Sequence, residues 1–277
     1  MRTCSDTRPF PAPLLFAALL LGASCTSTGH EPAHDVQGRD VVYASQDTEL
    51  HGYLAYDAEQ EGPRPGVLVV HEWWGHNEYA RRRARELAEM GYVALALDMY
   101  GEGKRAEHPQ DAQAFAGELM ANKDVAVARF RAARDFLSSQ PQADPAHVAA
   151  IGYCFGGGVV LHMARIGEDL DAVASFHGSL GTDAPARPGA VRAPLLVQTG
   201  ADDPFVPTEA VEAFRAEMEA AGAELTLIAY PGVKHSFTNP DATAIGERFE
   251  LPLVYDAEAD RATWAELERF LKASFAD

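Results

Sequence analysis

Basic residues are scarce in this sequence. Lysine and arginine number 23 against 41 aspartates and glutamates, which gives the 277 residues a formal net charge of −18. Because a chain this acidic repels phosphate backbones and anionic lipid surfaces, we expect neither nucleic acid as a partner nor membrane binding through a basic patch. The rest of the composition, 47% hydrophobic and 23% charged, is typical of a globular protein large enough to bury a sizeable core.

Long apolar runs are missing after the opening segment. In that segment two arginines precede an apolar run over 14–21, and three small residues then lead to Cys25. This order indicates a secretory signal, and the run is too short to span a membrane as a mature helix. A cysteine followed by a polar stretch resembles the end of a bacterial lipoprotein signal, with the large aliphatic residue, Leu21, one position early. We expect a signal over 1–25, export to the bacterial cell envelope and a lipid anchor on Cys25, with plain secretion or a misread start as the alternatives.

Cysteine is equally scarce, with three in the chain. Removal of the signal would take Cys4 and lipidation would occupy Cys25, which leaves Cys154 alone. A single thiol cannot form a disulfide within its own chain, so we expect the fold to be stabilised by its core.

Strand-like and helix-like patterns alternate along the chain after a polar tether over 26–38. With no repeat and no second linker, we expect residues 39–277 to form a single domain. Strand patterns lie at 40–44, 49–55, 66–71, 92–97, 148–152, 172–176, 195–199 and 224–230. Helical patterns lie at 78–90, 111–137, 155–165, 208–221 and 257–273. This alternation predicts an α/β fold with a mostly parallel central sheet and helices on both faces, whose reactive loops follow the carboxyl ends of the strands.

A candidate nucleophile lies where one predicted strand turns into a helix. The segment Gly152-Tyr153-Cys154-Phe155-Gly156 has the form of a nucleophile elbow, with cysteine where serine is usual. The turn is so sharp that the residues two positions away must be glycine, and it places the sulfur at a helix N-terminus, whose partial positive charge favours the thiolate. A buried structural cysteine beside a flexible turn is the alternative.

The chain order nucleophile, acid, histidine is present in the loops after two later strands. Asp202 and Asp203 follow one of them; we prefer Asp203 as the acid because Asp202 is one position too close to the strand, although both could instead cap the next helix. His235 follows the next strand and is the candidate general base. His71 and His177 also end strands and are its rivals.

The segment His71-Glu72-Trp73-Trp74-Gly75 follows the first buried strand. Such a loop supplies one N–H of an oxyanion hole and the residue after the nucleophile supplies the other, so we assign these donors to Trp73 and Phe155. Between His71 and His76 there is one residue too many for the helical zinc motif. We expect no metal and no cofactor.

Together these motifs resemble the dienelactone hydrolase family of α/β-hydrolases over most of the predicted domain. The likeness is carried by His-Glu-Trp-Trp-Gly at 71–75, Gly-Tyr-Cys-Phe-Gly-Gly at 152–157, Asp-x-x-Val-Pro at 203–207 and His-Ser-Phe at 235–237. The resemblance implies an α/β-hydrolase fold, a triad of Cys154, His235 and Asp203, and hydrolysis of a small ester or lactone through a thioester acyl-enzyme. It also implies that Glu72 contacts the resting thiol; a carboxylate salt-bridged at a loop is the alternative.

Two positions depart from the family's pattern. Its namesake enzymes hold the substrate's carboxylate with one arginine after the strand that ends near Asp98 and with another four residues after the histidine. In this chain those places carry residues 100–103, without arginine, and Asn239. Lys104 or Arg105 could reach in, although exposure to solvent is the default for both. A small ester or lactone other than dienelactone is therefore an equal candidate for the substrate.

Aromatic residues past strand ends are candidates for an apolar substrate pocket, and we assign Trp74, Tyr100 and Phe237 to it. Two other functions compete with hydrolysis: a non-catalytic ligand-binding protein with the same fold, and a redox-active thiol protein. All triad members are present, and no resolving cysteine would remain beside Cys154. We therefore favour the hydrolase.

Overall fold

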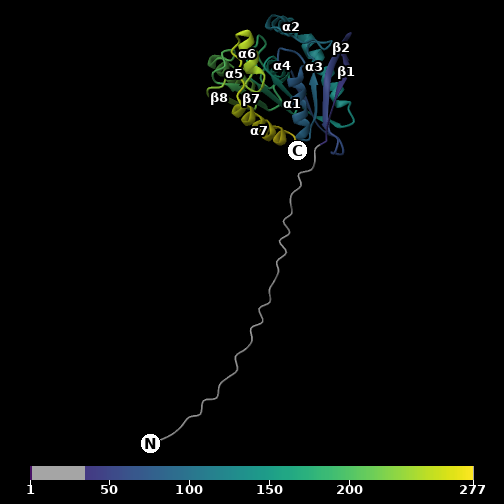
Figure 1. Ribbon diagram of the computed structural model, residues 1–277, viewed down its shortest axis with the longest axis vertical. Helices are drawn as coiled ribbons and strands as arrows, with labels where there is room; N and C mark the ends of the chain where they lie inside the picture. The colour runs from purple at the N-terminus through teal and green to yellow at the C-terminus, as the bar shows by residue number, and fades with distance from the viewer. Residues whose placement is uncertain (2–34, 277) are drawn as a thin grey trace. The chain divides into compact units, whose positions relative to one another are not determined.

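Eight strands form one mixed sheet that carries helices on both faces (Figure 1). The computed structural model describes residues 1 and 35–276. Its strands are β1 Val36–Ser45, β2 Thr48–Asp57, β3 Arg64–Val70, β4 Val93–Leu97, β5 Ala143–Tyr153, β6 Ala172–Phe176, β7 Leu195–Gly200 and β8 Leu225–Tyr230. Its helices are α1 Glu78–Glu89, α2 Pro109–Ala121, α3 Lys123–Ser138, α4 Phe155–Arg165, α5 Thr208–Ala221, α6 Ala242–Phe249 and α7 Ala257–Ser274.

The strand order of the sheet is β1-β2-β4-β3-β5-β6-β7-β8. Strand β2 pairs antiparallel with β1 and with β4, whereas all neighbours from β4 to β8 are parallel. Parallel neighbours need crossover connections, so the carboxyl ends of β3 to β8 lie at the same edge of the sheet. The predicted α/β fold with a mostly parallel sheet is confirmed, and the loops at this edge carry the candidate site.

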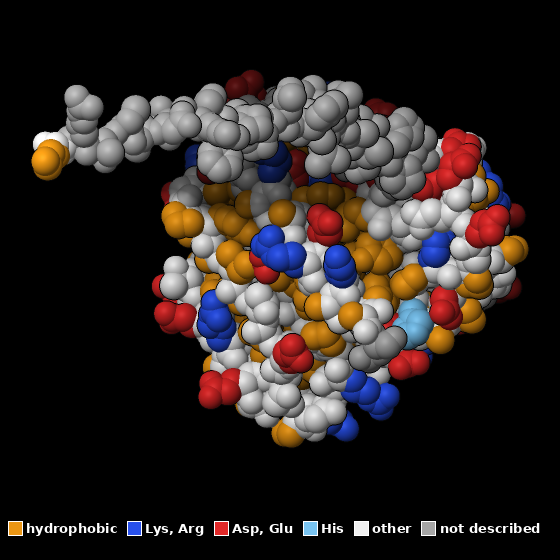
Figure 2. All heavy atoms as spheres, turned by 90° about the horizontal axis from the view of Figure 1, so that it is seen from below, with side chains coloured by type: hydrophobic (Ala, Val, Ile, Leu, Met, Phe, Trp, Pro, Cys, Tyr) orange, Lys and Arg blue, Asp and Glu red, His pale blue; other side chains and the backbone are white. Residues whose placement is uncertain are grey.

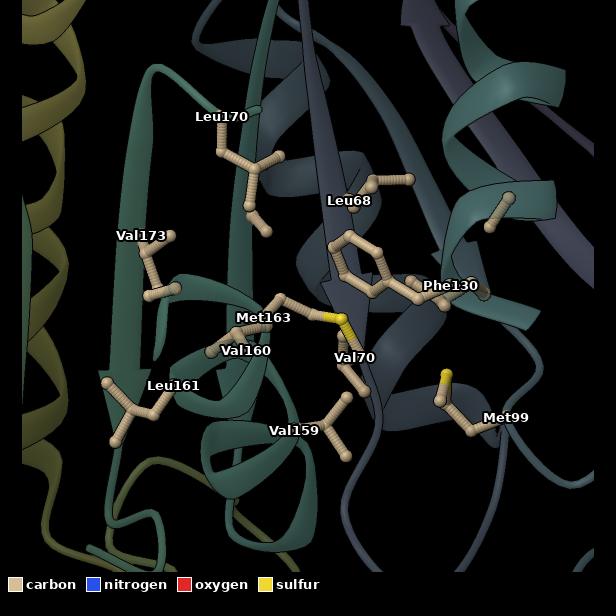
Figure 3. Close-up of a cluster of buried hydrophobic side chains, with 14 of the residues drawn as sticks. Leu68, Val70, Met99, Phe130, Val159, Val160, Leu161, Met163, Leu170 and Val173 are labelled. Carbon is tan, nitrogen blue, oxygen red and sulfur yellow. The ribbon is translucent and has the colours of Figure 1, made fainter. Parts of the chain in front are cut away.

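Alternation along the central strands divides the core into two layers. In β3, Leu68 and Val70 face one layer, while Val67 and Val69 face the other. The first layer packs against α3, α4 and α5; Figure 3 shows Phe130 of α3 beside Leu68 in this layer. The second layer packs against α1 and α7. All four β3 residues are fully buried, as a strand covered by helices on both faces requires.

Some boundaries differ from those that the sequence predicts. Strand β1 starts at Val36, which pairs with Asp57, so residues 36–38 belong to the sheet and not to the tether. The first residues of this edge strand are mostly exposed and show no alternation, which is why the pattern does not reveal them. The helical stretch over 111–137 is two helices, because the chain turns at Asn122 (φ −118°, ψ 63°). Helix α6 is not predicted, since its 8 residues are too few for a clear helical period.

The predicted signal, the lipid anchor on Cys25 and the tether up to residue 34 lie outside the described residues. Within residues 35–276, no helix combines the length and apolar character needed to cross a membrane. Figure 2 shows one face of the molecule, where Lys and Arg side chains are interspersed with Asp and Glu and do not gather in a patch. The charges on this face therefore form no extended field of one sign.

Two glycines allow β5 and α4 to meet at a sharp angle. A methyl group on Gly152 would lie 2.1 Å from the backbone oxygen of Gly156, and one on Gly156 would lie 2.4 Å from the carbonyl oxygen of Val70. Both contacts are far inside van der Waals distance and involve backbone atoms, which cannot move without displacing an element. A methyl group on Gly158 would lie 3.5 Å from its nearest neighbour, which is ordinary contact.

We expect Gly156→Ala to lower the free energy of unfolding by about 3 kcal/mol, because the added carbon forces β3 and α4 apart. Gly158→Ala, two residues along the same helix, is the matched control. It should be neutral or stabilise by up to about 1 kcal/mol, since alanine loses less backbone entropy in a helix. Urea unfolding followed by circular dichroism measures both variants. Equal stabilities would show that the close approach of β3 and α4 is not required.

Candidate active site

The loops after three parallel strands bring Cys154, Asp203 and His235 together. Cys154 follows β5, Asp203 follows β7 and His235 follows β8. His235 Nδ1 lies 2.7 Å from Asp203 Oδ2, and His235 Nε2 lies 3.1 Å from Cys154 Sγ. The imidazole therefore bridges a carboxylate and a thiol, which is the geometry of a nucleophile, a base and an orienting acid.

Cys154 occupies the strained turn between β5 and α4. Its backbone has φ 52° and ψ −114°, a conformation that residues other than glycine rarely adopt and that costs about 1–3 kcal/mol. The Cys154 N–H donates to Phe176 O (3.0 Å), and its carbonyl oxygen accepts from the Gly158 N–H (3.2 Å), so the strained residue is held at both ends. It is the N-cap of α4, the end of a helix that carries partial positive charge.

Of the two aspartates in the loop after β7, Asp203 is the one whose side chain faces the interior. It is buried, its Oδ1 accepts from the Phe205 N–H (2.8 Å), and its Oδ2 faces His235. Asp202 is exposed. Helix α5 begins after Pro207 without a side-chain cap, so the alternative in which these aspartates cap that helix is wrong.

The His235 ring is buried among groups that control its proton. Burial alone would lower the pKa of His235, but negative charge on Cys154 and the hydrogen bonds with Asp203 and Cys154 raise it to about 10. A protonated ring beside a negatively charged sulfur is the reactive form of such a pair. The rings of His177 and Phe205 pack on the imidazole, with centroids 5.1 and 5.0 Å away.

Glu72 is buried in the loop after β3. Its carboxylate accepts hydrogen bonds from the Ser236 hydroxyl (2.9 Å) and from the Asn239 amide (2.7 Å). Burial raises the pKa of Glu72, and these two hydrogen bonds and the charge of His235 offset only part of that rise. Within residues 35–276 the carboxylate forms neither a hydrogen bond to the thiol nor the ion pair of the alternative reading, and the contact with the thiol that the resemblance implies stays a prediction; His235 is the hydrogen-bond partner of the sulfur.

Ser236 and Asn239 are site residues that the sequence analysis does not assign. Asn239 is noted there only because an arginine is missing at its position. Both follow His235 within four residues, so their position in the loop of the candidate base could have identified them as site residues. What the sequence could not supply is their common partner, Glu72, which lies more than 160 positions earlier in the chain.

Two residues that line the cavity with Cys154 have an unpaired backbone N–H. Trp73 and Phe155 line the same cavity as Cys154, and neither N–H is hydrogen-bonded to another group of residues 35–276. The Phe155 N–H is in the first turn of α4, where the helix offers it no acceptor. The Tyr100 hydroxyl donates to the Trp73 carbonyl oxygen (2.9 Å) and so fixes the loop. The two N–H groups are therefore available to a ligand, and their assignment to an oxyanion hole stays a prediction.

A cavity of about 260 Å³ opens beside Cys154 and His235. The rest of its wall is mostly apolar and consists of Trp73, Ala116, Phe155, Ser179, Phe205, Val206 and Leu253. No lysine, arginine, aspartate or glutamate is among these lining residues. The cavity therefore suits an uncharged, largely apolar ligand.

Three aromatic residues predicted for the pocket do not line this cavity. Trp74 is buried against Phe249 of α6, a helix that the sequence pattern does not predict (ring centroids 6.1 Å apart). Tyr100 packs against Phe155 and lines a separate cavity of about 240 Å³. Phe237 is fully buried in a small cluster under the loop after β8. In this protein, an aromatic residue at the end of a strand therefore indicates packing in the core as much as it indicates contact with a ligand.

The lining residues that the sequence analysis misses fall into two groups. Phe205 and Val206 lie inside the Asp-x-x-Val-Pro segment, so the motif that contains Asp203 could have identified them as lining residues. Ala116, Ser179 and Leu253 lie in segments without any motif, and only the tertiary structure brings them to the cavity.

The two rival histidines have other partners. His71 Nδ1 lies 2.5 Å from Glu72 O, and its Nε2 accepts from the Met99 N–H (3.2 Å), so both ring nitrogens are committed to the backbone. His177 Nε2 lies 2.8 Å from Thr238 Oγ1. Neither histidine bonds the sulfur, and His235 does.

The cations considered as substitutes for the missing arginines are at the surface. Lys104 and Arg105 are exposed, and Lys104 pairs with Glu102 (3.2 Å). Neither lines the cavity beside Cys154. In residues 35–276 no group of three or more histidine, cysteine or acidic side chains could hold a metal ion.

Comparison with known proteins agrees with this arrangement. The sequence pattern of the dienelactone hydrolase family matches residues 50–275. Protein usf of Aquifex pyrophilus is 31% identical over 208 residues, which cover 73% of this chain and 87% of that protein. A protein of Yersinia pestis, provisionally named carboxymethylenebutenolidase, is 28% identical over 215 residues, covering 74% of this chain and 80% of its own.

Solved structures show the same likeness. The structure of m3DLH is 35% identical in sequence and superposes with a TM-score of 0.81, covering 87% of this chain and 99% of that one. The family pattern and this structural match both extend over nearly all of the described domain. The chain therefore belongs to the dienelactone hydrolase family, and its fold is that of the α/β-hydrolases.

Proposed function

We propose that this protein hydrolyses small, neutral carboxylic esters or lactones through a thioester on Cys154. The observation that carries the proposal is the bridge that His235 forms between Asp203 (2.7 Å) and Cys154 (3.1 Å) at the wall of an apolar cavity. Membership of the dienelactone hydrolase family and the name of the Yersinia pestis relative support ester or lactone hydrolysis as the reaction class.

In the acylation step the negatively charged Cys154 sulfur attacks the carbonyl carbon. A sulfur–carbon bond forms, and the carbonyl electron pair moves to the oxygen. The N–H groups of Trp73 and Phe155 donate to this oxyanion, and each such donor lowers the barrier by about 3 kcal/mol. When the bond to the leaving group breaks, the His235 imidazolium gives its proton to the departing alkoxide.

In the deacylation step the neutral His235 accepts a proton from water while the water oxygen attacks the thioester carbonyl. The second tetrahedral intermediate collapses, the sulfur–carbon bond breaks, and the acid and the Cys154 thiolate are released with His235 protonated again. Asp203 holds the ring with its Nδ1–H toward the carboxylate and stabilises the positive charge that the ring carries.

The substrate class follows from the groups around the cavity. Its lining contains no cation that could pair with a substrate carboxylate. Of the two positions where the family's namesakes have arginine, the first carries Tyr100 and its neighbours, and Asn239 at the second is bonded to Glu72. The acidic chain, with a net charge of −18, adds no long-range attraction for an anion. A neutral ester is therefore favoured over a carboxylate-bearing lactone.

Removal of the nucleophile is the direct test. Cys154→Ala should lower kcat for 4-nitrophenyl butyrate by at least about 1,000-fold, because no side chain remains to form the acyl-enzyme. Cys154→Ser should retain activity above that of Cys154→Ala, since a hydroxyl can still be activated by His235. Equal thermal unfolding of the three proteins is the control for folding. Undiminished hydrolysis by Cys154→Ala would refute the proposal.

The raised pKa of His235 predicts a basic limit for substrates with poor leaving groups. Below that pKa, about 10, the ring is protonated and can supply the proton that an alkoxide needs; above it the proton is lost. For ethyl butyrate, kcat/KM should therefore fall about tenfold per pH unit above the pKa. The same measurement with 4-nitrophenyl butyrate is the control, because nitrophenolate leaves without a proton. The titratable groups that face His235 are Cys154, Asp203, His177 and Glu72. A basic limb shared by both esters would contradict the assignment.

The uncharged cavity predicts discrimination between two acyl groups of equal length. We expect kcat/KM for 4-nitrophenyl valerate to exceed that for mono-4-nitrophenyl glutarate by at least about tenfold, because the glutarate carboxylate would be buried without a partner. Ala116→Leu, which fills part of the cavity, should slow valerate more than acetate, and Gly158→Ala, on α4 outside the lining, is the control. Equal rates for valerate and glutarate would show that a cation reaches the site.

A further inference from the structure

His177 stands behind the catalytic imidazole, at the end of β6. Its side chain is fully buried, its backbone has φ 40°, and its N–H donates to Gln198 O (2.8 Å). The His177 ring packs against the His235 ring, with centroids 5.1 Å apart and planes at 68°. The reaction steps above give this histidine no part, although any tilt of its ring would be transmitted directly to His235.

A chain of buried polar groups leads from α1 to His177. Thr238 Oγ1 lies 2.8 Å from His177 Nε2 and 2.6 Å from the Tyr79 hydroxyl. The Tyr79 oxygen accepts from Arg83 Nε (3.4 Å), and Arg83 Nη2 donates to the Thr238 carbonyl oxygen (2.7 Å). Tyr79, Arg83, Thr238 and His177 are all buried. We call these four residues the relay.

The direction of the hydrogen bonds in the relay follows from its first member. A guanidinium can only donate, so the Tyr79 oxygen accepts from Arg83 and its single O–H is free to donate to Thr238. The Thr238 O–H then donates to His177 Nε2, and the proton of His177 is on Nδ1. In the opposite direction the buried Tyr79 proton would have no acceptor. His177 Nδ1 has no hydrogen-bond partner within residues 35–276 in either direction, so it does not decide between them.

This arrangement keeps His177 uncharged beside a charged neighbour. Burial lowers the pKa of His177 well below its usual value, and the positive charges of His235 and Arg83 lower it further. A second proton on His177 would repel the one on His235 and weaken the attraction between the imidazolium and the Cys154 sulfur. The other groups that face His235 are Asp203 and Glu72.

We propose that His177, oriented by the Thr238 hydroxyl, is a positioning residue that holds the His235 ring toward Cys154. Thr238 lies three residues after His235 on the same loop, so one hydroxyl ties the catalytic loop to the end of β6 and to α1. The proposal rests on the proposed function only in taking Cys154 and His235 as the reacting pair. It concerns the state of that pair before any substrate binds.

Alkylation of Cys154 by iodoacetamide tests this without a substrate. The rate is followed between pH 5 and 9 in the full chain by mass spectrometry of the peptide that contains Cys154. Thr238→Val keeps the shape of the side chain and removes the hydroxyl. We expect it to raise the midpoint of the alkylation profile by about one pH unit and to slow alkylation by up to about tenfold at pH values below the wild-type midpoint, because a freely tilting ring pairs less well with the sulfur.

Two control variants separate positioning from packing. Thr238→Ser restores the hydroxyl and should return the profile to that of the wild type. Thr199→Val makes the same exchange at another buried threonine, whose hydroxyl has no partner within residues 35–276, and should leave the profile unchanged. An unchanged profile in Thr238→Val, or an equal change in Thr199→Val, would overturn the proposal.

If Thr238→Val does not fold, His177→Phe tests the same proposal. It retains a ring against His235 but has no nitrogen for Thr238 to hold, and we expect a shift in the same direction. A wild-type profile in His177→Phe would overturn the proposal. If the wild type alkylates with an acidic midpoint yet hydrolyses no ester, the proposed function fails while this comparison still decides the role of His177.

Discussion

The chemistry proposed for this domain depends on one contact, the 3.1 Å between His235 Nε2 and Cys154 Sγ. The two residues are 81 positions apart, and each lies in a loop. Their contact therefore requires that the strands before these loops keep their positions relative to each other. Cys154 adds strain of about 1–3 kcal/mol at its turn, which the packing of β5 between two helical layers must offset. The rigid core is therefore what allows a strained cysteine to contact a histidine from a distant loop.

The fold and the proximity of Cys154, His235 and Asp203 could be predicted because they depend on local signals that the topology combines. Glycines on either side of Cys154 indicate a turn too sharp for a side chain, and the methyl group that would lie 2.1 Å from a backbone oxygen at Gly152 gives the physical reason. Continuous apolar runs predict strands buried on both faces, and parallel strands place their carboxyl ends at one edge. Once the strands and their common edge are predicted, an aspartate and a histidine that directly follow later strands are expected to lie near Cys154.

The cavity beside Cys154 could not be predicted in the same way, because much of its wall comes from segments that carry no local signal. Trp74 follows a strand and is aromatic, but α6 supplies Phe249 to cover it. Ala116 lines the cavity from α2, which the sequence pattern does not separate from α3. The partners of Glu72 could not be predicted for a related reason. The sequence identifies a carboxylate, but it does not identify the residues that bury that carboxylate in the folded protein.

The short loop over 235–239 joins these features. His235 contacts the acid and the sulfur, Ser236 and Asn239 hold Glu72, and Thr238 reaches His177. Every residue of this loop is buried, so its hydrogen bonds act in a medium where an unmade bond is costly. Because Asn239 is a neutral donor, it satisfies Glu72 without adding a positive charge, and burial then keeps the pKa of Glu72 raised. An arginine at this position would place a positive charge beside Glu72 and lower the pKa of that carboxyl group, so the residue at position 239 affects the acid–base state of the site.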